Sequence, residues 1–268
     1  MIRICSLIAV FCVAALGPFL GHAQSLNFGS GDIPIEIDAD NGIEWQQDSL
    51  VFVARGNARA LRGEVQVLAD ELRAYYRKST DGATEIWRLD AIGSVQIKST
   101  EGTAFGDKAL YDVDNSVLTI TGKNLRLVSG QDWLTARDQL EFWEKKQMAV
   151  ARGNAVAKRA DKKLNANVLA AYFRKNKKGD TGIYRVDAFD DVKILTDKDQ
   201  ASSERGVYNV ETGIATLTGS VQITRDSNVL NGCSAEVNLN TGVSKLHSCG
   251  TPGTRVQGSF RPEKKKSN

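Results

Sequence analysis

Apolar and polar residues alternate with a period of two along much of this chain. The alternation is clearest in three segments, PIEIDA at 34–39, SVQIKS at 94–99 and NLRLVS at 124–129. A period of two places every second side chain on the same face, which is typical of a strand with one buried face. The pattern therefore predicts an all-β protein.

Short turn sequences separate the alternating segments, and two-residue pairs of this kind favour tight reversals between strands. They are Asn41-Gly42, Asp81-Gly82, Asp114-Asn115, Gly179-Asp180 and Thr241-Gly242. No proline occurs between Ile35 and Thr251, and because proline removes a donor from the ladder, its absence favours a long antiparallel sheet. The segment ADELRAYYRKS at 69–79 has helical residue preferences, but its repeat partners are strand-like, so we predict a strand there too.

The chain contains an internal repeat with a period of 97 residues. VARGNARALR at 53–62 recurs as VARGNAVAKR at 150–159, and AYYRK at 74–78 recurs as AYFRK at 171–175. A smaller spacing of roughly 30 residues, one pair of strands and a turn, divides each copy. We therefore expect a first β module at 24–154 and a second module at 155–250 that continues the same stack of hairpins.

The two ends of the chain differ from the repeated part. Residues 1–23 have one positive charge near the start, an apolar run and the small residues Gly21 and Ala23, which predicts a secretory signal peptide cleaved before Gln24 and export of the chain. Retention of this segment as a membrane anchor is the alternative. We expect residues 251–268 to form a disordered basic tail. Without Arg3 the charge falls to +2, which gives no reason to expect nucleic-acid binding.

Two cysteines remain after the signal peptide, Cys233 and Cys249. An even pair in an exported chain favours a disulfide. A hairpin centred on Thr241 would place them opposite one another, so the bridge is expected to hold the last hairpin together.

The sequence offers little for catalysis. His247 is the one histidine outside the predicted signal peptide, so a zinc site built from several histidines is not expected, and neither is any cofactor. Asp90 and Asp187 are equivalent in the repeat and leave open a polysaccharide-active enzyme with a carboxylate pair. We interpret them as structural residues and expect a protein that is not an enzyme.

The segments PIEIDADNGIEW, VFVARGNARAL, VQVLADELRAYY and GDKALYDVDNSVLTITG together resemble the LptA/OstA-like family of periplasmic lipopolysaccharide transport proteins. The resemblance covers roughly residues 35–154. It implies an elongated, open, V-shaped antiparallel β-jelly roll whose apolar trough shields the acyl chains of lipid A. It also implies partners that join end to end by strand addition: an inner-membrane LptC-like protein, an outer-membrane LptD-like protein, or further copies of the chain.

The resemblance and the alternation together suggest a lipid-binding lining. Ile35, Ile37, Ile97, Tyr111 and Val113 match family groove positions, and Ile194, Tyr208 and Val210 are the repeat equivalents of the last three. Phe52, Leu118 and Ile120 are proposed from alternation alone. All of these side chains could instead be ordinary core between two sheets. Leu50–Ala54 is apolar at both its odd and its even positions, so the sequence leaves open which set points inward.

The leading hypothesis is therefore a periplasmic carrier and bridge for lipopolysaccharide. The alternatives are the membrane-anchored partner of the same system, a repetitive β-fold enzyme acting on polysaccharide, and a purely structural periplasmic scaffold.

Overall fold

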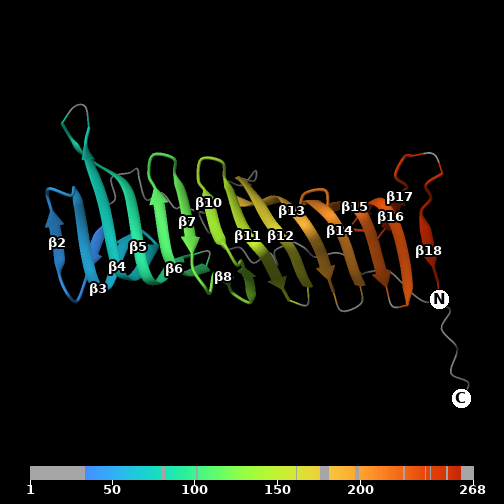
Figure 1. Ribbon diagram of the computed structural model, residues 1–268, viewed down its shortest axis with the longest axis horizontal. Helices are drawn as coiled ribbons and strands as arrows, with labels where there is room; N and C mark the ends of the chain where they lie inside the picture. Colours follow the sequence, from blue (N-terminus) through green and yellow to red (C-terminus); the bar gives the residue numbers. More distant parts are fainter. Residues whose placement is uncertain are drawn as a thin grey trace, which may run out of the picture.

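The computed structural model describes residues 34–79, 82–100, 102–160, 162–175, 181–196, 199–225, 227–238, 240–241, 243–251 and 253–260. The predicted signal peptide and the last eight residues lie outside this part of the chain. The described residues contain eighteen strands in one sheet, all paired antiparallel, which confirms the predicted all-β class. The strands stack side by side along the long axis of the molecule, from β2 at one end to β18 at the other (Figure 1).

The strands have the following bounds: β1 Glu36–Asp38, β2 Ile43–Gln46, β3 Val51–Arg62, β4 Val65–Lys78, β5 Thr84–Ser99, β6 Gly102–Asp112, β7 Val117–Thr121, β8 Arg126–Ser129, β9 Asp132–Thr135, β10 Gln139–Trp143, β11 Met148–Arg159, β12 Lys162–Lys175, β13 Thr181–Leu195, β14 Asp199–Asn209, β15 Ile214–Arg225, β16 Asn228–Asn238, β17 Val243–His247 and β18 Gln257–Ser259. The segment with helical preferences forms β4. β11 begins 97 positions after β3, and β12 begins 97 positions after β4.

Most long strands are interrupted near their middle by a β-bulge. The pairing of β3 with β4 shifts between Arg55 and Ala58, and that of β13 with β14 shifts between Phe189 and Val192. The two bulged residues of β3 have positive φ, 79° at Gly56 and 43° at Asn57. Such a bulge bends the strand and increases its twist, so the row of bulges divides the sheet into two arms.

We define the first arm as the sheet formed by these segments: 43–46, 51–55, 71–78, 84–92, 108–112, 117–121, 139–143, 148–152, 168–175, 181–189, 205–209, 214–218, 234–238 and 243–247. The second arm comprises β1, β8, β9, β18 and the remaining halves of the long strands. At the centre of the molecule the strand itself is broken at the bend, because residues 122–125 separate β7 from β8. In the second copy of the repeat, β15 runs through the equivalent region as one strand.

Residues paired across neighbouring strands point to the same face, so the register defines rows of side chains that cross the whole sheet. A row near the bend in the first arm contains Ile43, Ala54, Leu72, Ala91, Ala109, Ile120, Leu140, Ala151, Leu169, Ala188, Gly206, Leu217, Ala235 and Leu246. We call it the bend row. Every residue in it is apolar, and many are small, which lets the two arms approach closely beside the bend.

Two further rows complete the inner faces. The rim row of the first arm contains Trp45, Phe52, Ala74, Leu89, Tyr111, Leu118, Phe142, Ala149, Ala171, Val186, Tyr208, Ala215, Val237 and Ser244. The second-arm row contains Ile37, Ala60, Val67, Ile97, Ala104, Leu127, Leu134, Ala157, Leu164, Ile194, Ala201, Ile223, Leu230 and Gly258.

The inner faces of the two arms pack against one another. Ile97 from the second arm and Tyr111 and Leu118 from the first arm belong to one hydrophobic cluster, and each is no more than 6% exposed. A second cluster around Leu217 and Val221 continues the core toward the C-terminal strands. Buried apolar side chains of the two arms therefore form clusters along much of the described sheet.

Candidate lipid-binding groove

The structure places the residues proposed for lipid binding on the inner faces or next to them. Phe52, Tyr111, Leu118 and Tyr208 lie in the rim row, and Ile120 lies in the bend row. Ile37, Ile97 and Ile194 lie in the second-arm row. Ile35 directly precedes β1, and Val113 and Val210 directly follow β6 and β14. Their contact with lipid stays a prediction, because core packing alone produces the same placement.

The structure also answers the question that the sequence left open at Leu50–Ala54. Phe52 pairs with Ala74, whose row leads to Tyr111, and Ala54 pairs with Leu72, so both point inward. Val51 and Val53 point to the outer face, where Val53 pairs with Glu44 and Arg73. Both valines are nevertheless buried on that face.

A cluster of aromatic residues lies at the N-terminal end of the groove. Phe52 stacks on Trp45 at 5.3 Å between ring centroids and contacts Tyr76 at 5.1 Å. The Trp45 indole N–H donates a hydrogen bond to the Tyr76 hydroxyl at 2.7 Å. The cluster leaves Trp45 61% exposed, so the end of the groove presents a large apolar surface to solvent.

One polar contact interrupts the apolar lining near the middle of the groove. The Tyr111 hydroxyl donates to Glu144 Oε2 at 2.8 Å. Burial raises the pKa of the Glu144 carboxyl, while the positive charge of Arg62 lowers it. Arg62 ends β3 on the second arm, two positions after Ala60 and therefore on the same inner face. Sequence reasoning selected Tyr111 but missed Glu144 and Arg62. Glu144 lies two positions after Phe142, and Arg62 lies two positions after Ala60. The period of two would therefore have placed both side chains on the inner face.

The outer face of the first arm holds the two carboxylates considered for catalysis. Asp90 accepts two hydrogen bonds from Arg88, at 2.7 Å each, and Asp187 accepts two from Arg185 at 2.6 and 2.8 Å. Both carboxylates are buried, so their bidentate arginines neutralise charges that would otherwise be costly. Asp90 is on β5 and Asp187 on β13, six strand steps apart in the sheet, or about 29 Å at ~4.8 Å a step. They do not form a carboxylate pair.

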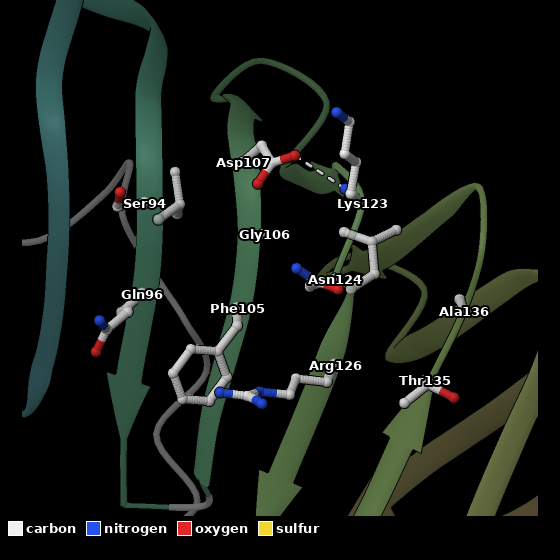
Figure 2. A pocket seen from close by; sticks show the side chains of 12 residues that line it. Ser94, Gln96, Phe105, Gly106, Asp107, Lys123, Asn124, Arg126, Thr135 and Ala136 are labelled. Carbon is white, nitrogen blue, oxygen red and sulfur yellow. Dashed lines mark hydrogen bonds between the residues drawn. The ribbon is translucent and has the colours of Figure 1, made fainter.

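A hollow of about 650 Å³ lies on the outer face, where β7 breaks from β8. Its lining includes Gln96, Phe105, Arg126 and Thr135, which pair with one another on the face opposite the second-arm row (Figure 2). The Arg126 guanidinium lies 4.2 Å from the Phe105 ring centroid. The lining also includes Val95, Leu125 and Ala136 of the hydrophobic cluster, so the hollow reaches from the outer face to the core at the break in the strand.

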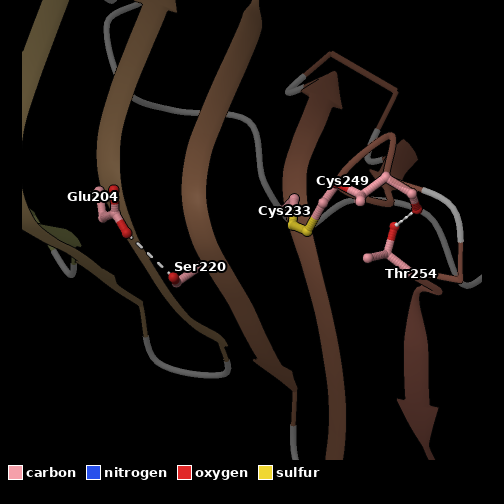
Figure 3. The surroundings of a disulfide bond; sticks show 6 residues. Glu204, Ser220, Cys233, Cys249 and Thr254 are labelled. Atoms are coloured by element: carbon pink, nitrogen blue, oxygen red, sulfur yellow. Dashed lines mark hydrogen bonds between the residues drawn. A yellow bond between two sulfur atoms is a disulfide. The ribbon is translucent and has the colours of Figure 1, made fainter.

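The predicted disulfide joins Cys233 to Cys249, with their Cα atoms 5.0 Å apart (Figure 3). The register differs from the prediction, because Ser234 pairs with His247 and the ladder ends there. Asn238 Oδ1 accepts hydrogen bonds from the backbone N–H groups of Asn240 and Thr241, which centres the turn between these two residues. The bridge lies just beyond the end of the β16–β17 ladder.

The strand β18 corrects part of the predicted disordered tail. Residues 257–259 pair with Asn231, Leu230 and Val229 of β16. The disulfide holds the chain beside β16 after β17 ends, and this gives the following residues access to the unpaired half of the strand. The alternation in this segment is too short to have predicted a strand.

Comparisons with known proteins then decide the family. The sequence profile of the LptA/(LptD N-terminal domain) LPS transport protein family matches residues 36–138 and again residues 136–243. The chain belongs to this family. The two matches together cover most of the described strands, so membership rests on both halves of the sheet.

Two individual proteins are also similar to this member of the lipopolysaccharide transport family. An uncharacterised protein of Rhizobium meliloti (strain 1021) is 26% identical over 151 residues, which cover 54% of this chain and 80% of that protein. The crystal structure of LptH, described as the LptA-homologous periplasmic component of the lipopolysaccharide transport device of Pseudomonas aeruginosa, matches with 11% identity and a TM-score of 0.23, over 86% of this chain and 96% of LptH.

The described residues lack two features that mark other classes of protein. They contain no group of three or more His, Cys, Asp or Glu side chains placed to hold a metal ion. Nor do they include a helix of the length and apolarity that crossing a bilayer requires.

Proposed function

We propose that this chain is a periplasmic carrier and bridge for lipopolysaccharide that shields the acyl chains of lipid A between its two arms. The observation that carries the proposal is the set of three inner rows, which stay apolar across almost every strand. An interior that served only as a core would not need such continuity from one end of an elongated sheet to the other. Family membership supports the same function.

In this proposal the acyl chains enter by separating the arms. Moving a chain of about 12 carbons out of water gains on the order of 10 kcal/mol, at ~0.8 kcal/mol per CH₂. That gain offsets the loss of contacts between the facing rows, because the hydrocarbon replaces one apolar neighbour with another. The arms are joined at bulges rather than by a rigid layer, so their separation would not break the ladders within either arm.

The ends of the sheet suit the addition of a partner's strand. Several exposed large apolar side chains of the described residues lie near the two ends: Ile37, Ile43, Trp45, Val243, Val256 and Phe260. If β17 of one copy paired with β2 of the next in the same rows, Leu246 would face Ile43 and Lys245 would face Glu44. We therefore include LptC-like and LptD-like partners and head-to-tail copies of the chain in the proposal.

A photo-crosslinking experiment tests the function. A benzophenone amino acid at Tyr111 or Tyr208 should capture lipopolysaccharide during transport, because both positions lie in the rim row. The same residue at Thr119 should not, because Thr119 pairs with Leu110 and Glu141 on the outer face. Equal capture at all three positions, or at none, would contradict the proposed groove.

The cellular location has a separate test. The proposal requires export through the predicted signal peptide, residues 1–23. N-terminal sequencing of the protein recovered from the periplasm should begin at Gln24. A chain that begins at Met1 and sediments with the inner membrane would support the anchored partner of the same system instead.

A further inference from the structure

The Glu144 carboxylate lies at the rim of the groove and faces inward. Glu144 follows Phe142 by two positions, and Phe142 pairs with Leu118 in the rim row. The backbone N–H of Glu144 donates to the Ser116 carbonyl at 3.0 Å, which fixes this turn beside the start of β7. From there the side chain reaches the Tyr111 hydroxyl at 2.8 Å.

Only one oxygen of this carboxylate is satisfied. Oε2 accepts the bond from Tyr111, whereas Oε1 is buried and has no hydrogen-bond partner among the described residues. Buried polar atoms are almost always paired, so an unpaired carboxylate oxygen requires an explanation. A second buried unpaired side-chain oxygen among the described residues, Asn165 Oδ1, belongs to a residue between the inward-facing Leu164 and Ala166 and therefore lies on the outer face.

The surroundings of Oε1 define what could satisfy it. Tyr111, Leu118 and Val113 belong to the hydrophobic cluster or pack against it, so the neighbourhood is mainly apolar apart from the positive charge of Arg62, which also acts on the carboxyl. A carboxylate oxygen accepts hydrogen bonds and cannot bind an anion favourably. The missing group is therefore a donor carried by a molecule that is otherwise apolar.

We propose that Glu144 and Tyr111 form a polar subsite for a hydroxyl group near the polar end of an acyl chain. This inference rests on the proposed lipid-carrying function and adds a specificity-determining contact to it. When the arms separate around a chain, Oε1 becomes accessible at the rim, and a hydroxyl there donates the hydrogen bond that the free protein lacks. A chain without the hydroxyl leaves the oxygen unpaired.

The repeat does not reproduce the subsite at its equivalent positions. The positions 97 residues before and after Glu144 are occupied by Gln47 and Thr241, so neither repeat equivalent supplies a carboxylate. Gln47 is also exposed, in the turn that follows β2. It therefore provides a matched control position in a similar turn.

The test uses the full-length mature protein and two uncharged probes, the methyl esters of 3-hydroxytetradecanoic acid and tetradecanoic acid. Displacement of a fluorescent fatty-acid analogue measures the affinity of each ester. The hydroxylated ester should bind about tenfold more tightly, as expected of one hydrogen bond to a charged acceptor. Glu144→Met should bring the affinity ratio close to one and leave binding of the plain ester no weaker.

Two further variants keep the test decisive. Tyr111→Phe should also reduce the ratio, because the hydroxyl that orients Glu144 is lost, and Gln47→Met should preserve it. A ratio of one in the wild-type protein, or an equal loss of both affinities in Glu144→Met, would overturn the subsite. If neither ester displaces the fluorophore, the lipid-carrying function itself is wrong, so the two failures are distinguishable.

Discussion

At the scale of single residues, the bulge positions decide how the sheet bends. Gly93 has φ of 78°, and a Cβ there would overlap the Asp70 carboxylate of the neighbouring strand. The next residue, Ser94, has φ of 47° and places its hydroxyl 3.4 Å from Asp70 Oδ2. Glycine is needed here for both its left-handed backbone and the close approach.

We therefore expect Gly93→Ala to lower the free energy of unfolding by about 2 kcal/mol, from backbone strain and overlap together. Gly82 is the control, since it has φ of 85° but a Cβ added there would meet no other atom within 4 Å. Gly82→Ala should cost only about 1 kcal/mol. Urea denaturation measures both variants, and equal losses would show that the contact with Asp70 is unimportant.

The buried Glu144 carboxyl gives a pH-dependent prediction. Burial raises its folded-state pKa, so the protonated form favours folding, and stability from this group is lost as pH rises through the folded pKa. Glutamine does not ionise, so replacing Glu144 with Gln removes this loss of stability at higher pH. The stability of Glu144→Gln relative to the wild type should therefore increase from pH 3.5 to pH 7. Denaturation at both values measures it, and a difference independent of pH would contradict the burial of the charge.

At the scale of elements, the C-terminal hairpin depends on a covalent bond. β17 and β18 are five and three residues long and both pair with β16 alone among the described strands. Short end strands gain little from packing, because they have a neighbour on one side only. The bridge between Cys233 and Cys249 limits how far this segment can separate from β16 when it opens.

Replacing both Cys233 and Cys249 with Ser should lower the stability of this end by about 3 kcal/mol, the loop-closure value for a separation of 16 residues. Amide hydrogen exchange should accelerate in β16, β17 and β18, with little change in β4 and β5. A reducing agent should reproduce the effect in the wild type and do nothing to the double variant. Uniform acceleration across all strands would show that the bridge stabilises the whole sheet instead.

At the scale of the whole molecule, the charges at the two ends of the sheet are complementary. The N-terminal end carries Glu36, Asp38, Asp40 and Glu44, of which Asp38 and Glu44 pair with Arg59 and Arg55, whereas the described chain after Val237 has basic residues such as Lys245 and Arg255 and no acidic residue. Opposite charges at opposite ends favour head-to-tail contact and disfavour contact between like ends.

We expect Lys245→Glu to weaken head-to-tail association, because position 245 would then face Glu44 of the next copy with the same sign of charge. The double variant Glu44→Lys with Lys245→Glu should recover much of the association, since the pair is restored with reversed signs. Sedimentation velocity over a range of concentrations measures the three proteins. Identical behaviour of the single variant and the wild type would contradict this register.

The sequence by itself determined the strands and the class of fold, because strand formation here is a local property. Alternation placed Leu118 and Ile120 on a buried face, turn pairs marked the hairpins, and the pair of cysteines indicated a bridge. These features depend on neighbours within a few positions or on a simple count, so no knowledge of distant contacts was needed to predict them.

Only the tertiary structure decided how distant strands meet. It showed that Phe52 rather than Val53 points inward, that Asp90 and Asp187 lie far apart, and that Glu144 meets Tyr111 across 33 positions of sequence. The bulges at positions such as Gly93 set the bend between the arms, and the bend sets which inner faces oppose one another. In a fully apolar segment the odd and even positions look alike, so the sequence cannot tell which set faces the core. A contact across a bend depends on the twist accumulated over many strands.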